Sequence, residues 1–204
     1  MVLPMNSRVR AALLPVAAFM LVLGIGAGGW LLLSHNAVPQ LGGIGGPFTL
    51  TDGAGQTVTD RTLRGRYLLV YFGYTFCPDV CPTTLTAVAG ALDKLGKQAD
   101  RLQPVFITVD PARDTPKVIG AYTAAFSSRI LGLTGTDDQI AAVAREYRVY
   151  YAKRRTGEGP GDYTMDHSSI LYLMAPDGHF IAPIAANETA AQMAADIARH
   201  LNAG

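Results

Sequence analysis

The 204-residue sequence contains only two cysteines, Cys77 and Cys81, and each is followed directly by a proline. A disulfide that closes so short a loop restricts the unfolded chain little, because the stabilisation from a cross-link grows with the length of the loop it closes. The scarcity and closeness of the cysteines therefore exclude a framework of structural bridges. We expect the two cysteines to have a chemical role instead of a structural one.

The sequence also lacks an excess of charge of either sign. Arg8 and Arg10 stand near the N-terminus, and the remainder of the chain carries 15 basic residues against 16 acidic ones. This balance gives no excess of positive charge that could bind nucleic acid, so we expect no nucleic-acid partner. The basic run at residues 153–155 is expected to be part of a solvated loop.

No charged residue occurs between Arg10 and Asp52, and residues 11–33 form an apolar run long enough to cross a bilayer as a helix. The run exceeds a typical signal-peptide core and no A-x-A site follows it, which favours an uncleaved anchor over the alternative of a cleaved signal peptide. Because the arginines precede the span, residues 1–10 are expected in the cytoplasm and the rest of the chain is expected to be exported.

Glycine-rich residues 34–46 are typical of a flexible linker, and residues 47–204 are long enough for one exported domain. We expect this domain in the bacterial periplasm, tethered to the inner membrane by a single span. The alternative is the mitochondrial inner membrane, with the domain facing the intermembrane space.

Segments with strand and helix patterns alternate along this domain, which predicts an α/β fold with helices layered on a sheet. An N-terminal β-hairpin is expected at 48–59, further strands at 66–74, 104–110, 130–135, 168–174 and 179–184, and helices at 82–95, 116–126, 137–151 and 188–201.

The two cysteines lie where the second predicted strand passes into its helix. Residues that precede proline are biased away from helical conformation, so we expect the helix to begin at Pro82, with Cys81 as its N-cap. Both sulfurs would then lie near the positive end of a helix, which stabilises thiolate. Thiolates of this spacing can bind one metal ion or form a disulfide with each other. Two sulfur donors favour Cu(I) or Zn(II) and leave a position that imidazole commonly fills.

Four histidines could supply that imidazole. His35 adjoins the apolar run, His179 lies in a predicted hairpin and His200 on the last helix, and surface roles are expected for all three. His167 differs because it directly precedes a predicted buried strand, at an edge where the loops of an α/β sheet converge. A hydrogen-bonded structural histidine is the alternative for His167.

Four segments, "YFGYTFCPDVCPTTL", "ITVDPARDTP", "GLTGTDDQIAAVAREYRVYY" and "DYTMDHSSILYLMAPDG", resemble the Sco/SenC family of copper-binding, thioredoxin-like proteins that assist cytochrome c oxidase assembly. The resemblance extends from about Pro47 to the C-terminus. It implies a thioredoxin-like fold, and one copper ion, Cu(I) or Cu(II), bound by Cys77, Cys81 and His167.

The resemblance also implies partners: copper-donating chaperones, and oxidase subunit II, whose CuA centre would receive the metal. The dithiol could also reduce that subunit's cysteines by forming a Cys77–Cys81 disulfide. Asp79 matches the family and could tune the charge beside the metal or bind a partner, and the alternative is a favourable interaction with the helix dipole. Asp110 also matches, as do Arg113 and Asp114, and these are expected chiefly as turn and ion-pair residues close to the site.

Two other classes of function remain open at this point. The first is an enzyme, either a thiol-disulfide oxidoreductase or a thiol peroxidase, with Cys77 or Cys81 as nucleophile. The second is a copper- or redox-sensing module. The role of His167 discriminates between an oxidoreductase and a copper site. An oxidoreductase needs only the dithiol, whereas a copper site needs a third ligand.

Overall fold

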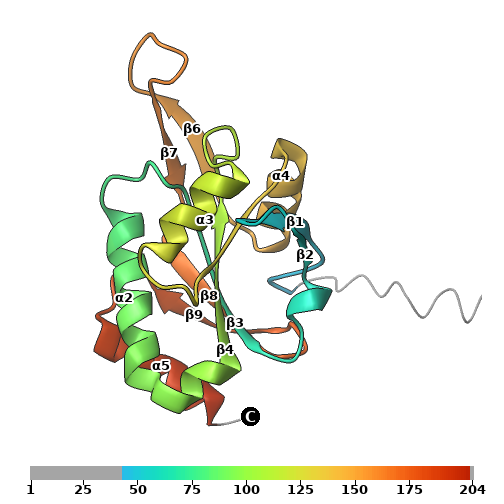
Figure 1. Ribbon diagram of the computed structural model, residues 1–204, viewed down its shortest axis with the longest axis vertical. Coiled ribbons are helices and arrows are strands. Elements are labelled where there is room, and N and C mark those ends of the chain that lie inside the picture. Colours follow the sequence, from blue (N-terminus) through green and yellow to red (C-terminus); the bar gives the residue numbers. More distant parts are fainter. Residues whose placement is uncertain (1–42, 203–204) are drawn as a thin grey trace, which may run out of the picture. The chain divides into compact units, whose positions relative to one another are not determined.

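The computed structural model describes residues 43–202, so the predicted anchor at 11–33 and most of the linker lie outside the described residues. None of the helices within residues 43–202 is long and apolar enough to cross a bilayer. The elements of this part, labelled as in Figure 1, are β1 (Thr49–Asp52), β2 (Thr57–Thr59), η1 (Arg61–Leu63), β3 (Tyr67–Gly73), α2 (Val80–Leu95), η2 (Gly96–Arg101), β4 (Leu102–Thr108), α3 (Pro116–Ala124), β5 (Leu131–Thr134), α4 (Asp137–Glu146), β6 (Tyr151–Arg155), β7 (Tyr163–His167), β8 (Ile170–Met174), β9 (Phe180–Ala185) and α5 (Ala190–Leu201).

A seven-stranded sheet in the order β2-β1-β5-β4-β3-β8-β9 forms the centre of the domain. Strands β3, β4 and β5 are parallel, whereas β8 and β1 pair antiparallel with the two sides of this group. The first two strands form the expected N-terminal hairpin. This is the layered α/β arrangement that the alternating pattern predicts.

Strand β3 shows why the sheet is covered on both faces. All seven of its residues are buried, and alternate side chains enter two different hydrophobic clusters. Tyr67, Leu69 and Tyr71 belong to the first cluster, with apolar residues of α2, α3 and α5, while Leu68, Val70 and Phe72 belong to the second, with those of α4. Burial on both faces explains why the strand reads as one continuous apolar run.

The start of helix α2 differs from the prediction. The N-cap is Asp79 rather than Cys81, and the helix begins at Val80, with Thr83 N–H donating to the Asp79 carbonyl at 3.2 Å. Pro82 is tolerated at the third helical position because the first N–H groups of a helix have no partner within it. Cys81 consequently lies in the first turn of α2, and Cys77 lies in the preceding turn as predicted.

The predicted helix at 137–151 is too long. Helix α4 ends at Glu146, and Arg148 adopts a left-handed conformation with φ 54°. The N–H of Arg148 donates to the Arg145 carbonyl and that of Val149 to the Ala144 carbonyl, which is the hydrogen-bond pattern of a left-handed helix stop.

The chain then continues into a strand pair that the sequence analysis did not predict. Strands β6 and β7 form an antiparallel hairpin, so the basic run at 153–155 is β-strand rather than loop. This hairpin is a separate two-stranded sheet and projects from the domain at the top of Figure 1.

Candidate metal centre

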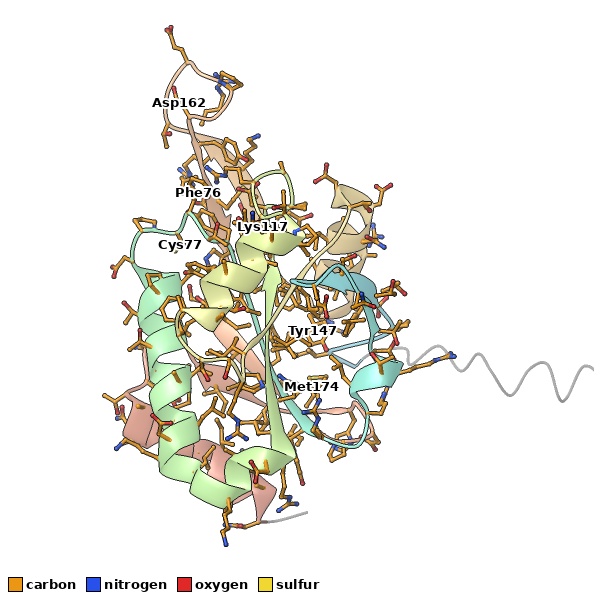
Figure 2. All side chains as sticks on the ribbon, in the orientation of Figure 1. Phe76, Cys77, Lys117, Tyr147, Asp162 and Met174 are labelled. Carbon is orange, nitrogen blue, oxygen red and sulfur yellow. The ribbon has the colours of Figure 1, made fainter. Side chains whose placement is uncertain are left out.

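One ligand atom from each of Cys77, Cys81 and His167 lies within 4.8 Å of the other two, and no other group of this kind occurs within residues 43–202. The Cys81 Sγ and His167 Nε2 atoms are 3.5 Å apart although 86 residues separate them in the chain. Both cysteines are free thiols. Figure 2 shows Cys77 above the start of α2, on the side of the domain that carries the β6–β7 hairpin.

The Cys81 sulfur occupies a closely fitted, fully buried position beneath the end of β3. A Cβ atom on Gly73 would lie 2.7 Å from Cys81 Sγ and 2.7 Å from the Phe106 ring. The Tyr71 hydroxyl donates to Cys81 Sγ at 3.8 Å. Gly73 therefore leaves the space for the sulfur, and Tyr71 orients it.

The Cys77 sulfur lies in the loop between β3 and α2 and is partly exposed. Cys77 N–H donates to the Tyr74 carbonyl at 3.2 Å, which closes the turn. The preceding residues are fixed by buried Asp114, whose carboxylate accepts hydrogen bonds from the Thr75 N–H at 3.0 Å and the Thr75 hydroxyl at 2.6 Å. The loop that presents Cys77 is thus tied to the segment after β4.

The two thiols differ strongly in acidity. Hydrogen bonding from the Cys81 side chain, opposed by burial and aided by His167 and the Cys81 N–H, lowers the pKa of Cys77 to about 4. The adjacent Cys77 sulfur and burial instead raise the pKa of Cys81 above its usual range. In the metal-free protein one thiolate is therefore ready at neutral pH, and the second proton must leave when a metal ion binds.

The His167 ring is held by its neighbours in one orientation. Its Nδ1 atom lies 3.1 Å from the Ser168 carbonyl, which can only accept a hydrogen bond, so Nδ1–H donates there and Nε2 is the ring nitrogen that faces the sulfurs. The rings of Tyr71 and Tyr74 contact the imidazole edge-on, with centroids 6.2 and 5.9 Å away. These contacts hold the imidazole with Nε2 facing Cys81 Sγ.

The remaining candidate residues lie outside this group. His179 is exposed and bonded to Asp177, and His200 is half-buried in the last turn of α5. Asp79 is exposed at the N-cap of α2. Asp110 is buried and forms an ion pair with Arg113, as the sequence analysis expects.

Three residues that shape the site were missed from the sequence: Gly73, Tyr71 and Tyr74. The clearest signal was the glycine at the end of a buried strand, just before the cysteine turn, because glycine in such a place often marks a close approach of another group. The tyrosines gave no signal, since aromatic residues are ordinary in a buried strand.

The chain matches known proteins over this whole domain. The family model described as SCO1/SenC matches residues 37–202. The human protein SCO1 homolog, mitochondrial, is 42% identical over 160 residues, which cover 78% of this chain and 53% of that protein. Protein SenC of Rhodobacter capsulatus is 49% identical over 138 residues, which cover 68% and 62%. The chain thus spans about half to two thirds of the length of these relatives.

A solved structure supports the same relationship. The copper-bound structure of Bradyrhizobium japonicum ScoI superposes with a TM-score of 0.71 at 47% identity, covering 76% of this chain and 98% of that one. This likeness confirms the thioredoxin-like α/β fold that the sequence resemblance implies.

We predict that alkylation of Cys77 by iodoacetamide is nearly independent of pH between about 6 and 8, because its thiolate is already formed. An ordinary thiol, with a pKa of about 8.5, would react roughly tenfold faster for each pH unit across this range. The rate is measured by mass spectrometry on the reduced, metal-free protein. The control is Cys77→Ser, which leaves only the buried Cys81 and should react slowly. A wild-type rate that climbs steadily up to pH 8 would contradict the lowered pKa.

Proposed function

The chain belongs to the SCO1/SenC family, and from this premise we propose that it is a copper chaperone that assists assembly of the CuA centre of cytochrome c oxidase. The observation that carries the proposal is the convergence of Cys77, Cys81 and His167 to within 4.8 Å. Two sulfurs and one imidazole suit copper: soft thiolates favour Cu(I), and imidazole adds a ligand suited to Cu(II). Copper is here the cargo, one ion per domain.

The different exposure of the two sulfurs supports a role in passing the metal on. Cys77 and His167 are partly exposed, whereas Cys81 is fully buried. An incoming ligand from a copper-donating chaperone, or from oxidase subunit II, would reach the metal from the side of Cys77. Exchange of one ligand at a time avoids release of free copper.

A second function, thiol-disulfide exchange on exported proteins, is favoured by one specific observation. A partly exposed, acidic Cys77 beside a buried Cys81 of raised pKa is the arrangement of a nucleophilic and a resolving cysteine. In this reaction the Cys77 thiolate attacks a substrate disulfide, and Cys81 then displaces the reduced substrate. The chain's dithiol loses two electrons to the substrate disulfide; the Cys81 thiol gives up one proton, and solvent supplies the second proton that the two substrate thiols take up.

We further propose that residues 11–33 anchor the chain in a membrane and that the copper site lies on the outer side. The support is Arg8 and Arg10 ahead of an apolar run without charge. The bacterial inner membrane is the proposed location, and the mitochondrial inner membrane is the alternative.

We predict that the reduced protein binds one copper ion and that Cu(II) loading produces a strong thiolate-to-copper charge-transfer band. Cys77→Ser or Cys81→Ser should abolish the band, because each removes a sulfur ligand. Absorption spectroscopy and metal analysis after removal of loose copper measure both properties. Air-oxidised protein with a Cys77–Cys81 disulfide is a chemical control that should bind no copper until a dithiol reduces it.

His167→Ala separates the copper function from thiol exchange, since it keeps both thiols. We expect it to retain disulfide exchange and to lose Cu(II) affinity by more than the roughly 10- to 100-fold that loss of a residue supporting a ligand costs. It should also fail to restore oxidase activity to a strain that lacks the native protein. If His167→Ala matched wild type in copper retention and in oxidase activity, His167 would be a structural histidine and thiol exchange would be the better proposal.

For the anchor, we predict that alkaline phosphatase fused after residue 50 of the full chain is active in a bacterial host, because the phosphatase folds only when exported. The fused chain should also resist alkaline extraction from membranes. Replacing Arg8 and Arg10 by glutamate is the control and should lower the active fraction. An inactive wild-type fusion would reverse the proposed orientation, and a mature N-terminus near residue 37 would show cleavage instead of anchoring.

A further inference from the structure

The β6–β7 hairpin carries the third ligand of the candidate site but forms no backbone ladder with the seven-stranded sheet in the described part of the chain. A two-stranded hairpin by itself is at best marginally stable in water. His167 is the last residue of β7, paired with Tyr151. The position of the imidazole therefore depends on side chains that fix the hairpin to the body of the domain.

One face of β7 makes this attachment. Tyr163, Met165 and His167 alternate along the strand and so share a face, and the first two are buried in the second hydrophobic cluster. His167 lies four residue steps along the strand from Tyr163, a distance of about 13 Å. A displacement of the strand at Tyr163 would be transmitted along the same face to the imidazole.

Arg113, in the loop between β4 and α3, contacts Tyr163 at the start of β7. Its guanidinium lies 3.8 Å from the centre of the Tyr163 ring, and its Nη1–H donates to the Tyr163 carbonyl at 3.1 Å. The Nε–H of Arg113 donates to Asp110, whose other carboxylate oxygen accepts from the Tyr163 hydroxyl at 2.9 Å. The arginine and the aspartate therefore hold the backbone, the ring and the hydroxyl of one tyrosine.

The same guanidinium also contacts the loop that presents Cys77. It lies 4.6 Å from the ring centre of Phe76 and 5.7 Å from that of Tyr74. The Tyr74 hydroxyl is in turn 2.7 Å from the Thr164 hydroxyl of β7. Arg113 thus touches both segments that supply ligands, the loop before α2 and the hairpin.

The arrangement is specific to an arginine. The planar guanidinium stacks on aromatic rings while its N–H groups donate in its own plane, and a lysine ammonium cannot do both. The Arg113 Nη2 atom is buried without a hydrogen-bond partner among the described residues, although a buried donor left unpaired is unfavourable. The ion pair with Asp110 alone does not account for the contacts that the guanidinium makes with three aromatic rings.

We propose that Arg113, together with Asp110 and Tyr163, is a positioning clasp that sets the β6–β7 hairpin, and so the His167 imidazole, against the cysteine loop. The clasp acts through the hairpin and touches no ligand atom. Its effect on metal binding rests on the proposed copper function, whereas its effect on the hairpin does not.

The test compares Arg113→Lys with Arg154→Lys in the full chain. Arg113→Lys keeps a cation beside buried Asp110, so the fold should survive. Arg154 carries the same substitution on the hairpin, but its partner is Asp166 of the same hairpin rather than a residue of the body. Tyr163→Phe, which removes only the hydroxyl bonded to Asp110, is a milder second variant in case Arg113→Lys does not fold.

The first readout uses metal-free protein. Amide hydrogen exchange in β6 and β7 should be about tenfold faster or more in Arg113→Lys, while exchange in β3 and β4 stays as in wild type, because local opening has its own free energy. Arg154→Lys should leave both regions unchanged. Equal acceleration of all strands, or none, would overturn the clasp.

The second readout uses copper. Arg113→Lys should weaken Cu(II) binding by about 10- to 100-fold, with loss of the nitrogen hyperfine signal of imidazole, and should spare Cu(I) binding by the two sulfurs. A loosened hairpin with an unchanged Cu(II) site would overturn the positioning role. A wild-type protein that bound no copper would overturn the proposed function instead, and hydrogen exchange would still decide whether Arg113 fixes the hairpin.

Discussion

The 3.5 Å approach of Cys81 Sγ to His167 Nε2 is the contact on which the candidate site depends. Its two atoms come from different kinds of structure. Cys81 lies in the first turn of α2, beneath the end of a strand that is buried on both faces, and is as firmly placed as any core residue. His167 ends a small hairpin outside the main sheet, so its place is set by side chains rather than by a backbone ladder. A firmly placed sulfur and a histidine outside the main sheet would suit the proposed chaperone function, in which the site takes up copper and later releases it.

The environment of each thiol follows from this placement. The neighbouring Cys77 sulfur and burial raise the pKa of Cys81, whereas hydrogen bonds, first among them that with Cys81, lower the pKa of Cys77 to about 4. Cys77 is consequently the thiolate with which an incoming metal ion, or the disulfide of a substrate protein, would react first. The same asymmetry would serve either of the two proposed functions, metal uptake or thiol exchange, and the histidine is what would distinguish a copper site from a simple dithiol.

Much of the fold could be predicted from the sequence, because its signals are local. The apolar run of β3, the first hairpin and the alternation of strands and helices each follow from periodicity and turn residues, and His167 was singled out by its place before a strand. The β6–β7 hairpin could not be predicted, since β6 is largely charged, each strand has only five residues, and contacts such as that of Arg113 with Tyr163 join residues far apart in the sequence. The start of α2 was misplaced because the local bias of residues before proline gave way to tertiary packing of Cys81. Glycine at the end of a buried strand indicates a close approach at Gly73, but only the folded structure shows that the approaching group is the Cys81 sulfur.

The central claim is that Cys77, Cys81 and His167 together bind one copper ion. X-ray absorption spectroscopy at the copper edge, on the full chain loaded with one equivalent of Cu(II), tests this most directly because it counts the ligand atoms by element. The account predicts two sulfur neighbours and at least one imidazole nitrogen, with that imidazole signal lost in His167→Ala. A spectrum with fewer than two sulfurs, or an imidazole signal that persists in His167→Ala, would contradict it.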